Sequence, residues 1–429
     1  MFGRMSEFHA WFAERQRAQT CRVTPAPLDA LDGWEADRGA SLIRHRTGRF
    51  FTVEGLEVST GNGEGTSWAQ PIINQPESGI LGILVKRFGG VPHYLLQAKM
   101  EPGNINVLQL SPTVQATHSN YTGVHRGTAV PYLEYFLAPR RGKVLFDALQ
   151  SEQGAWFLRK RNRNMIIEVA EDVPLLDRFC WLTREQIGEL LRCENLVNMD
   201  TRTVLSGLPL PVNPDEPGAH STAEILSWFT EAKAGRRLER SRVPLDSIKD
   251  WVREEGRIVH TSGRYFSVMG VDVEAGDREV ARWSQPMIAP VGRGLIAFLT
   301  RTIQGVPHLL IQACTEAGTR DVVEVGPTVQ CNPGNFAQEP AASWPRFLGS
   351  VLSAPPSRIR LDVVHSEEGG RFYHAENRYA VVEAGDDFPD TVPDGFIWAT
   401  VGQLTELARL GNVVNVEARN LLASLRLIP

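Results

Sequence analysis

The stretch Trp68-Ala-Gln-Pro-Ile-Ile73 decides the fold, because it occurs a second time as Trp283-Ser-Gln-Pro-Met-Ile288, 215 residues later. The same spacing separates Pro112-Thr-Val-Gln115 from Pro327-Thr-Val-Gln330. Eight of the ten tryptophans also form pairs that lie 215 or 217 residues apart. Such a period is far longer than the roughly 20 to 50 residues of solenoid repeats. The sequence therefore predicts a tandem duplication in which each copy is a domain with its own core.

A proline-rich stretch marks the boundary between the copies. Residues 208–218 contain four prolines, which prevent a continuous helix and give a semi-rigid spacer. We therefore expect a first repeat over 1–208, a linker over 209–220 and a second repeat over 221–429.

Each copy is expected to be an α+β domain, a curved mixed sheet flanked by helices at its ends. Apolar residues at helical spacing predict opening helices over 7–17 and 225–234. Thr183-Arg-Glu-Gln186 has the pattern of a capping box, and it predicts the start of a closing helix. Last helices are predicted at 201–208 and 417–425, and strands at 50–58, 79–88, 93–100, 107–116, 143–149, 156–161 and 164–169.

The composition excludes several kinds of partner. A net charge of −5 argues against the concentrated basic surface that nucleic acids and anionic membranes require. The longest apolar runs, at 80–85 and 295–299, are far shorter than the roughly 20 residues that span a bilayer. Glu7 and His9 interrupt the segment where a secretion signal needs an apolar core. Five cysteines without a CxxC pair favour reduced thiols, so we expect a cytoplasmic protein.

The motifs of common catalytic sites are absent or incomplete. Residues 61–65 are glycine-rich but lack the Gly-Lys-Ser/Thr ending of a P-loop. Gly188, Glu194 and Arg202 fit the start of a Nudix box, but residues 203–207 lack the metal-binding glutamates that should follow. The sequence therefore argues against a metal-dependent pyrophosphatase, and we expect no metal site.

A row of polar residues interrupts one predicted strand. Gln97, Lys99 and Glu101 occupy alternate positions, so their side chains point to one face of the sheet. Such a row is either solvated surface or the floor of a pocket. The apolar residues 94–96 before it, and Pro102-Gly103-Asn104 after it, favour the pocket.

Two further groups of polar residues have a functional and a structural interpretation each. Gln115, His118, Ser119, Asn120, Tyr121, His125 and Tyr132 gather hydrogen-bonding groups in one loop, which is either a binding loop or a polar surface. Glu152 with Arg161, Asn162 and Arg163 returns as Glu367 with Asn377 and Arg378. Arginines near a glycine turn suit an anion such as pyrophosphate, but an internal Arg–Glu network explains them equally well.

These phrases resemble the NDP-hexose 2,3-dehydratase family. The resemblance rests on Trp-x-Gln-Pro, on 97–104, on 112–121 and on Ser366-Glu-Glu-Gly-Gly-Arg-Phe372, and it covers nearly the whole chain. It implies a Nudix-like fold without the Nudix box, a homodimer, and two nucleotide-sugar pockets per chain, of which one is catalytic. It also implies action on dTDP-4-keto-6-deoxy-D-glucose in the biosynthesis of deoxysugars for antibiotics, with a 3-ketoreductase or 3-aminotransferase acting next.

The reaction that the resemblance implies is a carbon–oxygen elimination without a redox cofactor. A base removes the C-3 proton, which the C-4 ketone acidifies, and the C-2 hydroxyl leaves with help from a general acid. The product becomes a 3,4-diketo-2,6-dideoxy sugar. Such a site needs a base, an acid and a donor to the enolate oxygen. Glu101 or His125 is then the expected base, and Tyr121 or Lys99 the acid or enolate donor.

The same resemblance implies an apolar surface for thymine and donors for the pyrophosphate. Trp68 or Tyr132 is expected to stack, and Arg161 or Arg163 to bind phosphate. The substrate-binding set is expected to be Trp68, Gln97, Gln115, Ser119, Asn120, Tyr132, Glu152, Arg161, Asn162 and Arg163. The second pocket is expected to comprise Trp283, Gln312, Gln330, Glu367, Glu368, Arg371, Tyr373 and Arg378.

Differences between the copies favour the first as the catalytic one. Cys314 stands where the first copy has Lys99, and Phe336 stands where it has Tyr121. Against this, the second copy has the richer Ser-Glu-Glu-Gly-Gly-Arg phrase, so a site shared between copies or subunits stays open. A catalytically silent nucleotide-sugar-binding scaffold is the alternative function.

Overall fold

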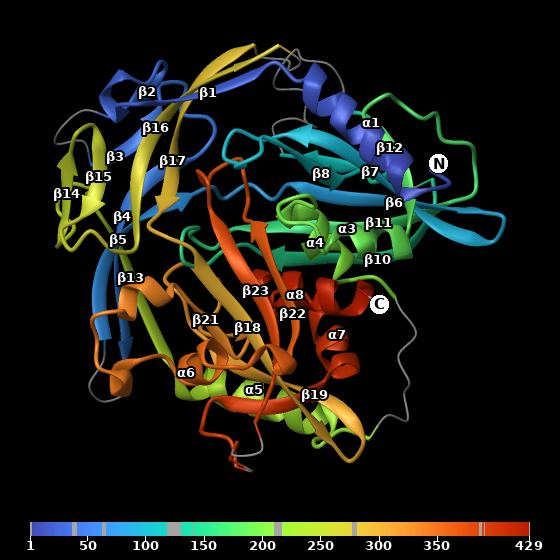
Figure 1. Ribbon diagram of the computed structural model, residues 1–429. Coiled ribbons are helices and arrows are strands. Elements are labelled where there is room, and N and C mark those ends of the chain that lie inside the picture. Colours follow the sequence, from blue (N-terminus) through green and yellow to red (C-terminus); the bar gives the residue numbers. More distant parts are fainter. Residues whose placement is uncertain are drawn as a thin grey trace.

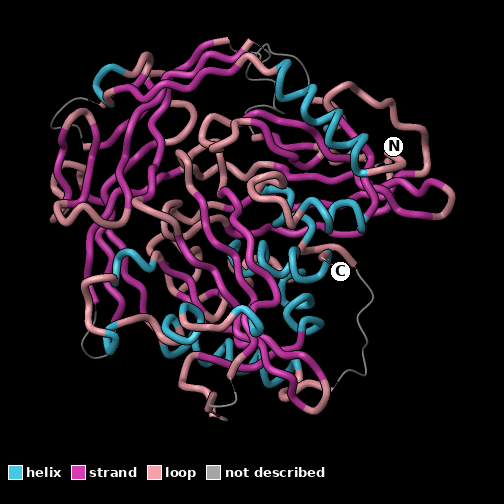
Figure 2. Tube along the Cα trace, viewed as in Figure 1, coloured by secondary structure: helices cyan, strands magenta, loops and turns pink. Residues whose placement is uncertain are grey.

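Each repeat contains one seven-stranded mixed sheet (Figures 1 and 2). The computed structural model describes residues 2–36, 41–61, 66–117, 130–139, 141–209, 217–276, 281–385, 388–389 and 391–428. The sheet of the first repeat consists of β6 (Ile80–Phe88), β7 (Val91–Met100), β8 (Leu108–Pro112), β9 (Val114–Ala116), β10 (Lys143–Ser151), β11 (Arg161–Val169) and β12 (Phe179–Thr183). Their order is β10-β11-β6-β7-β12, with β8 beside β7 and β9 beside β6. The pair β6 and β11 is parallel, and the apolar residues 80–85 are all buried, as expected for a strand covered on both faces.

The second repeat builds the same sheet. Its strands are β18 (Gly294–Ile303), β19 (Val306–Cys314), β20 (Glu324–Gly326), β21 (Val329–Cys331), β22 (Ile359–Ser366), β23 (Glu376–Glu383) and β24 (Phe396–Thr400). They follow the corresponding order β22-β23-β18-β19-β24, and β18 is parallel to β23. The matching topology confirms the duplication.

Apart from α6, the helices lie close to where the sequence predicts them. They are α1 (Met5–Ala18), α3 (Arg184–Leu190), α4 (Met199–Leu205), α5 (Thr222–Gly235), α6 (Leu348–Leu352), α7 (Val401–Arg409) and α8 (Val416–Leu427). Short 3-10 helices are η1 (Leu28–Ala30), η2 (Leu133–Tyr135), η3 (Pro333–Phe336), η4 (Ala341–Ser343) and η5 (Pro356–Arg358). The capping box before α3 is confirmed, since the Thr183 side chain accepts from the Gln186 amide and the Gln186 side chain accepts from the Thr183 amide.

Two five-stranded sheets join the repeats, because each contains a strand from the other repeat. One consists of β2 (Trp34–Glu35), β3 (Leu42–His45), β4 (Thr52–Gly61), β5 (Thr66–Asn74) and β13 (Arg237–Val243). The other consists of β1 (Cys21–Ala26), β14 (Trp251–Glu254), β15 (Arg257–His260), β16 (Phe266–Ala275) and β17 (Arg282–Pro290). Thus β1 of the first repeat pairs antiparallel with β16 of the second, and β13 of the second pairs with β4 of the first.

The hydrophobic cores follow this exchange. Separate cores lie against the large sheets, but a further core contains residues of both repeats, among them Phe51 and Phe157 of the first and Trp251 and Phe372 of the second. The expectation that each copy has a core of its own is therefore incomplete. Burial between the small sheets ties the two copies into one unit.

The backbones of Gly103 and Gly318 each form hydrogen bonds with the opposite repeat. Gly103 donates its amide to the Gly369 carbonyl at 2.7 Å, and its own carbonyl accepts from the His374 amide at 2.8 Å. Gly318 makes the matching contacts with the Gly154 carbonyl at 2.6 Å and the Arg159 amide at 2.7 Å. We call this pair of contacts the reciprocal clasp. A Cβ on Gly103 would lie 1.8 Å from a carbonyl oxygen of the opposing loop, so only glycine fits.

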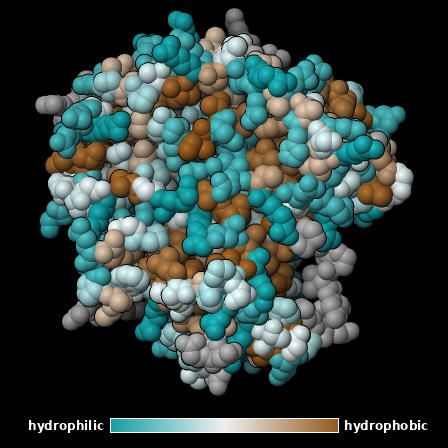
Figure 3. Space-filling view, viewed as in Figure 1, coloured by the Kyte–Doolittle hydropathy of each residue, from teal (hydrophilic) through white to brown (hydrophobic). Residues whose placement is uncertain are grey.

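Some predicted elements differ from the structure. The strand predicted at 156–161 is a turn with an isolated bridge at Phe157, because this segment hydrogen-bonds to Ile73 and the clasp instead of continuing a sheet. Strands β1, β2, β3, β5 and β12 of the first repeat were not predicted. The face in Figure 3 shows apolar and hydrophilic residues interspersed. Within the described residues, no helix is long and apolar enough to cross a membrane.

We predict that Gly103→Ala lowers the free energy of unfolding by about 3 kcal/mol or more, the upper end of the usual cost of overpacking. The added methyl group must push the backbones of the clasp apart. Gly349→Ala in α6 is the control, because nothing lies within 4 Å of its Cβ position. Urea unfolding should show no loss for the control. Equal stability of the two variants would contradict a tight clasp.

Candidate active site

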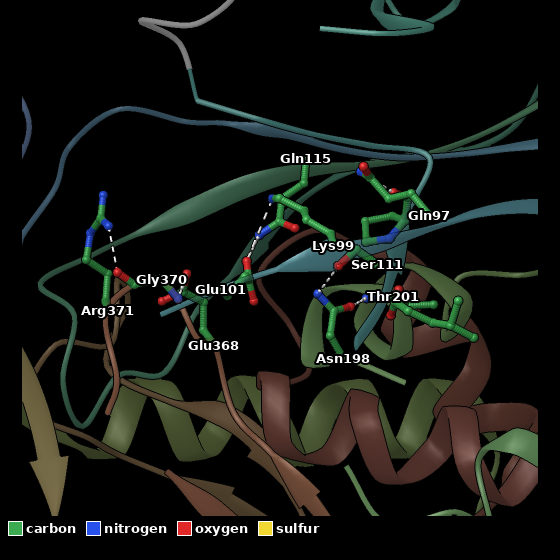
Figure 4. A network of polar contacts seen from close by, with 12 residues as sticks. Gln97, Lys99, Glu101, Ser111, Gln115, Asn198, Thr201, Glu368, Gly370 and Arg371 are labelled. Atoms are coloured by element: carbon green, nitrogen blue, oxygen red, sulfur yellow. Dashed lines mark hydrogen bonds and ion pairs between the residues drawn. The ribbon is translucent and has the colours of Figure 1, made fainter. Parts of the chain in front are cut away.

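Glu101 lies at the end of β7 and is almost completely buried, with 3% of its surface exposed. Its Oε1 accepts a hydrogen bond from Gln115 Nε2 at 2.5 Å, and Lys99 Nζ lies 3.7 Å from the same oxygen. The turn after Glu101 is closed by its amide, which donates to the Val107 carbonyl. The structure thus brings together three of the predicted site residues (Figure 4). Gln97 instead donates to the Pro112 carbonyl at 2.9 Å.

Glu368 of the second repeat reaches this cluster through the clasp. A Cβ on the adjacent Gly369 would lie 2.9 Å from Glu101 Cβ, which shows how closely the loop approaches. Glu368 Oε1 accepts from the Gly370 amide at 3.0 Å. Burial, together with the negative charge of Glu101, raises the pKa of Glu368 to about 7. The expectation that Glu368 belongs to the second pocket is therefore corrected, because its loop crosses to the first repeat.

The expectation that Arg371 belongs to the second pocket is corrected for the same reason, because its side chain also lies against the first repeat. Its guanidinium lies 4.3 Å from the ring of Phe51 in the first repeat, and its Nε donates to Gln75 Oε1 at 3.2 Å. Burial lowers its pKa, against the opposing effect of Glu368 and Glu101. Tyr373 points away, into a small apolar cluster of the second repeat, and stacks on its neighbour His374.

Two buried ionisable residues near the cluster were not predicted. Asp200, near the start of α4, has its pKa raised by burial and by the negative charges of Glu101, Glu152 and Glu368. Burial lowers the pKa of Lys160 to about 8, and its Nζ donates to the Glu77 carbonyl. Lys160 was not predicted because it lies among arginines, a charged pattern that is typical of a solvated surface. Asp200 gave no signal of a buried carboxyl in the sequence, because it lies in the polar stretch Asp200-Thr-Arg-Thr203 of α4.

Several buried polar atoms around Glu101 have no hydrogen-bond partner within the described residues. They are Gln115 Oε1, Asn104 Oδ1 and Nδ2, Glu368 Oε2 and Asp200 Oδ1. A buried group without a partner costs about 1–3 kcal/mol. A polar ligand that satisfied these atoms would recover that free energy, so the cluster is suited to bind one.

In the second repeat, the side-chain amide of Gln330, the counterpart of Gln115, has hydrogen-bond partners for both its nitrogen and its oxygen. Gln330 Nε2 donates to Glu316 Oε1 at 2.8 Å, and Gln330 Oε1 accepts from Asn415 Nδ2 at 2.7 Å. Glu324 and Glu417 each have one oxygen there without a partner among the residues that the structure describes. The amide oxygen that has no partner within the described residues of the first repeat therefore accepts a hydrogen bond in the second.

The two loops that the clasp holds against the opposite repeats bring different residues to the two sites. By the 215-residue spacing, Gln153 and Trp156 of the first repeat take the places of Glu368 and Arg371. Gln153 Nε2 donates to Glu367 Oε2 at 2.8 Å. The second site therefore lacks the carboxyl and the guanidinium that complete the first.

The two tryptophans contact both repeats. Trp68 packs in a cluster with Leu56 and Ile72 of its own repeat and Ala317 of the second, and Trp283 packs against clusters of both repeats. Their assignment to the first and second pocket, respectively, stays a prediction.

The predicted phosphate residues are mostly engaged within the protein. Asn162 donates to Glu152 Oε1 at 2.8 Å, and Arg163 makes a bidentate contact with Asp147. Arg378 pairs with Asp362 in the same way, Glu367 accepts from Tyr379, and Gln312 lies on β19. Arg161 lies near Arg320, and partial burial together with that charge lowers its pKa. The structural interpretation of these residues is favoured over a phosphate site.

Tyr132 also has a structural role, since its hydroxyl donates to the Pro174 carbonyl at 2.6 Å and accepts from the Leu176 amide. His93 and His308 bond to the carbonyls of Val91 and Val306 in matching turns. Ser119, Asn120, Tyr121 and His125 lie outside the described residues.

Buried carboxyls of the second site predict a pH-dependent stability. Burial and Glu324 raise the pKa of Glu316 to about 7, above the value near 4.5 of the unfolded chain. The unfolded state then loses its proton first as the pH rises, so this group destabilises the fold increasingly between about pH 4.5 and 7. We predict that Glu316→Gln raises the melting temperature at pH 8 and leaves it unchanged at pH 4.5.

Glu406→Gln, an exposed change in α7, is the control and should match the wild type at both pH values in calorimetry. A melting temperature of Glu316→Gln that is equal to the wild type at pH 8 would contradict a proton held by this buried carboxyl.

Comparison with known proteins places the chain in a family. The family model described as NDP-hexose 2,3-dehydratase matches residues 5–208 and again 222–425. A dTDP-4-dehydro-6-deoxy-alpha-D-glucopyranose 2,3-dehydratase of Streptomyces violaceoruber is 56% identical, over 98% of this chain and 97% of the relative. Proteins of the same name from Saccharopolyspora spinosa and Amycolatopsis orientalis are 50% and 49% identical, over 98% of this chain and 91% and 90% of their own lengths. The chain therefore belongs to the NDP-hexose 2,3-dehydratase family.

Proposed function

We propose that this protein is a dTDP-4-keto-6-deoxy-D-glucose 2,3-dehydratase that forms dTDP-3,4-diketo-2,6-dideoxy-D-glucose for deoxysugar biosynthesis. Family membership and the shared name of three relatives that cover nearly the whole chain support this function. The buried Glu101 cluster supplies groups of the kind that the elimination needs. We assign the reaction to the first repeat.

Glu101 is the proposed base. The Gln115 amide and the Lys99 ammonium both face its Oε1, which orients the carboxylate. Removal of the C-3 proton leaves an electron pair that delocalises onto the C-4 oxygen as an enolate. Lys99, at the partly exposed edge of the cluster, is the proposed donor to that oxygen, since a cation stabilises developing negative charge.

The second repeat has no equivalent of Lys99, and this difference supports our assignment of the reaction to the first repeat. Cys314 replaces it in the second repeat, and burial raises the pKa of that thiol well above its usual value. A neutral thiol cannot stabilise an enolate as an ammonium can. We therefore propose that the second repeat is a non-catalytic binding or structural site.

The assembly and classification are proposed on the same basis. The reaction makes the protein a carbon–oxygen lyase, and the family resemblance supports a Nudix-like fold in each repeat, a homodimer, and a 3-ketoreductase or 3-aminotransferase as the next enzyme. Five free cysteines support a reducing compartment such as the cytoplasm. Light scattering of the purified protein tests the dimer.

We predict that Glu101→Gln lowers turnover of the 4-keto sugar nucleotide at least 100-fold, because the amide cannot accept the C-3 proton. Glu316→Gln is the matched control at the equivalent position and should stay within about threefold of the wild type. Both are assayed with EDTA by trapping the product with a 3-ketoreductase and NADPH. The reverse pattern, with Glu316→Gln inactive and Glu101→Gln active, would place the reaction in the second repeat.

A further inference from the structure

Glu368 approaches the Glu101 cluster from the opposite repeat and has an unused oxygen. Its Oε1 is held by the Gly370 amide at 3.0 Å, whereas its Oε2 is buried without a hydrogen-bond partner within the described residues. The clasp fixes the loop that carries it, because Gly369 accepts from the Gly103 amide only two residues after Glu101. Figure 4 shows Glu368 and Glu101 as neighbours that come from different repeats.

We propose that Glu368 of the second repeat is the general acid that protonates the C-2 hydroxyl as it leaves the sugar, so that the active site is built from both repeats. This inference rests on the proposed dehydratase function. It adds a catalytic residue to that function and assigns the task for which the sequence suggested Tyr121 or Lys99.

The environment of Glu368 suits an acid. A carboxyl donates a proton at neutral pH only if its pKa is raised toward 7. Burial and the neighbouring charge of Glu101 have this effect on Glu368, while Arg371 opposes it. Two carboxyls that differ in environment can divide the roles of base and acid, and here the Gln115 amide and the Lys99 ammonium face Glu101 Oε1, whereas Glu368 Oε1 accepts from a backbone amide.

Lys99 suits the other role better. Its ammonium already faces Glu101 Oε1 at 3.7 Å, and donation of its proton would remove the positive charge that the enolate needs. The second site, to which the first repeat contributes Gln153, supports this division. There Cys314 replaces the lysine, and Gln153, whose amide has no acidic proton, replaces the glutamic acid.

The steps balance without an added reagent. Glu101 accepts the C-3 proton, and the C3–H electron pair forms the enolate. The enolate re-forms the C4=O bond and makes a C2=C3 bond, while the C2–O bond breaks. Its electron pair stays with the oxygen, which accepts the Glu368 proton and leaves as water. The resulting C-3 enol loses its O–H proton, takes up a proton at C-2 and becomes the 3,4-diketo sugar.

Glu368→Gln tests the proposal in three assays on the full-length protein. The first follows loss of water from the 4-keto sugar nucleotide, and the second follows deuterium entry at C-3 of recovered substrate in D2O. The third follows fluoride release from the analogue with fluorine in place of the C-2 hydroxyl, because fluoride leaves without protonation. We expect water loss to fall at least 100-fold, deuterium to enter C-3, and fluoride release to stay within about threefold of the wild type.

If Glu368→Gln melts at the wild-type temperature but loses activity in all three assays, the proposal is overturned. A residue that only positions other groups would affect every step in this way. Glu368→Asp keeps an acid and should restore part of the water loss; an Asp variant as slow as Glu368→Gln would also count against it. Glu101→Gln should fail in all three assays. A wild-type protein inactive with both substrates would instead overturn the proposed function itself.

Discussion

The reciprocal clasp at Gly103 and Gly318 is the contact on which the structure depends. Gly103 follows the buried Glu101 by two residues, Gly318 follows the partly buried Glu316 by two residues, and each glycine hydrogen-bonds to the backbone of the opposite repeat. A side chain at either position would collide with that backbone. The clasp therefore does more than join the copies, because it delivers residues of one repeat to the glutamate of the other.

This exchange explains how two similar sites acquire different chemistry. Sequence divergence in one copy changes the site of the other, since the loop after β22 completes the first site and the loop after β10 completes the second. The richer phrase around Glu368 seemed to favour the second repeat as catalytic. Once the loop is placed beside Glu101, the same phrase supports the first.

Much of the fold and part of the site could be predicted from the sequence. The duplication follows from phrases that return at a constant spacing, and the buried strand at 80–85 and the shared face of Lys99 and Glu101 follow from local pattern. Pairing of β1 with β16 could not be predicted, because an edge strand can pair with either copy of a duplicated sheet. For the same reason, the approach of the loop with Glu368 and Arg371 to the first repeat could not be predicted.

A crystal structure of Glu101→Gln with the bound 4-keto sugar nucleotide tests the composite site most directly. The account predicts that C-3 of the hexose lies about 3 to 3.5 Å from the side chain at position 101, the separation of reacting atoms in a near-attack geometry. It also predicts that the C-2 oxygen faces Glu368. A hexose ordered only beside Glu316, with no sugar between position 101 and Glu368, would contradict the account.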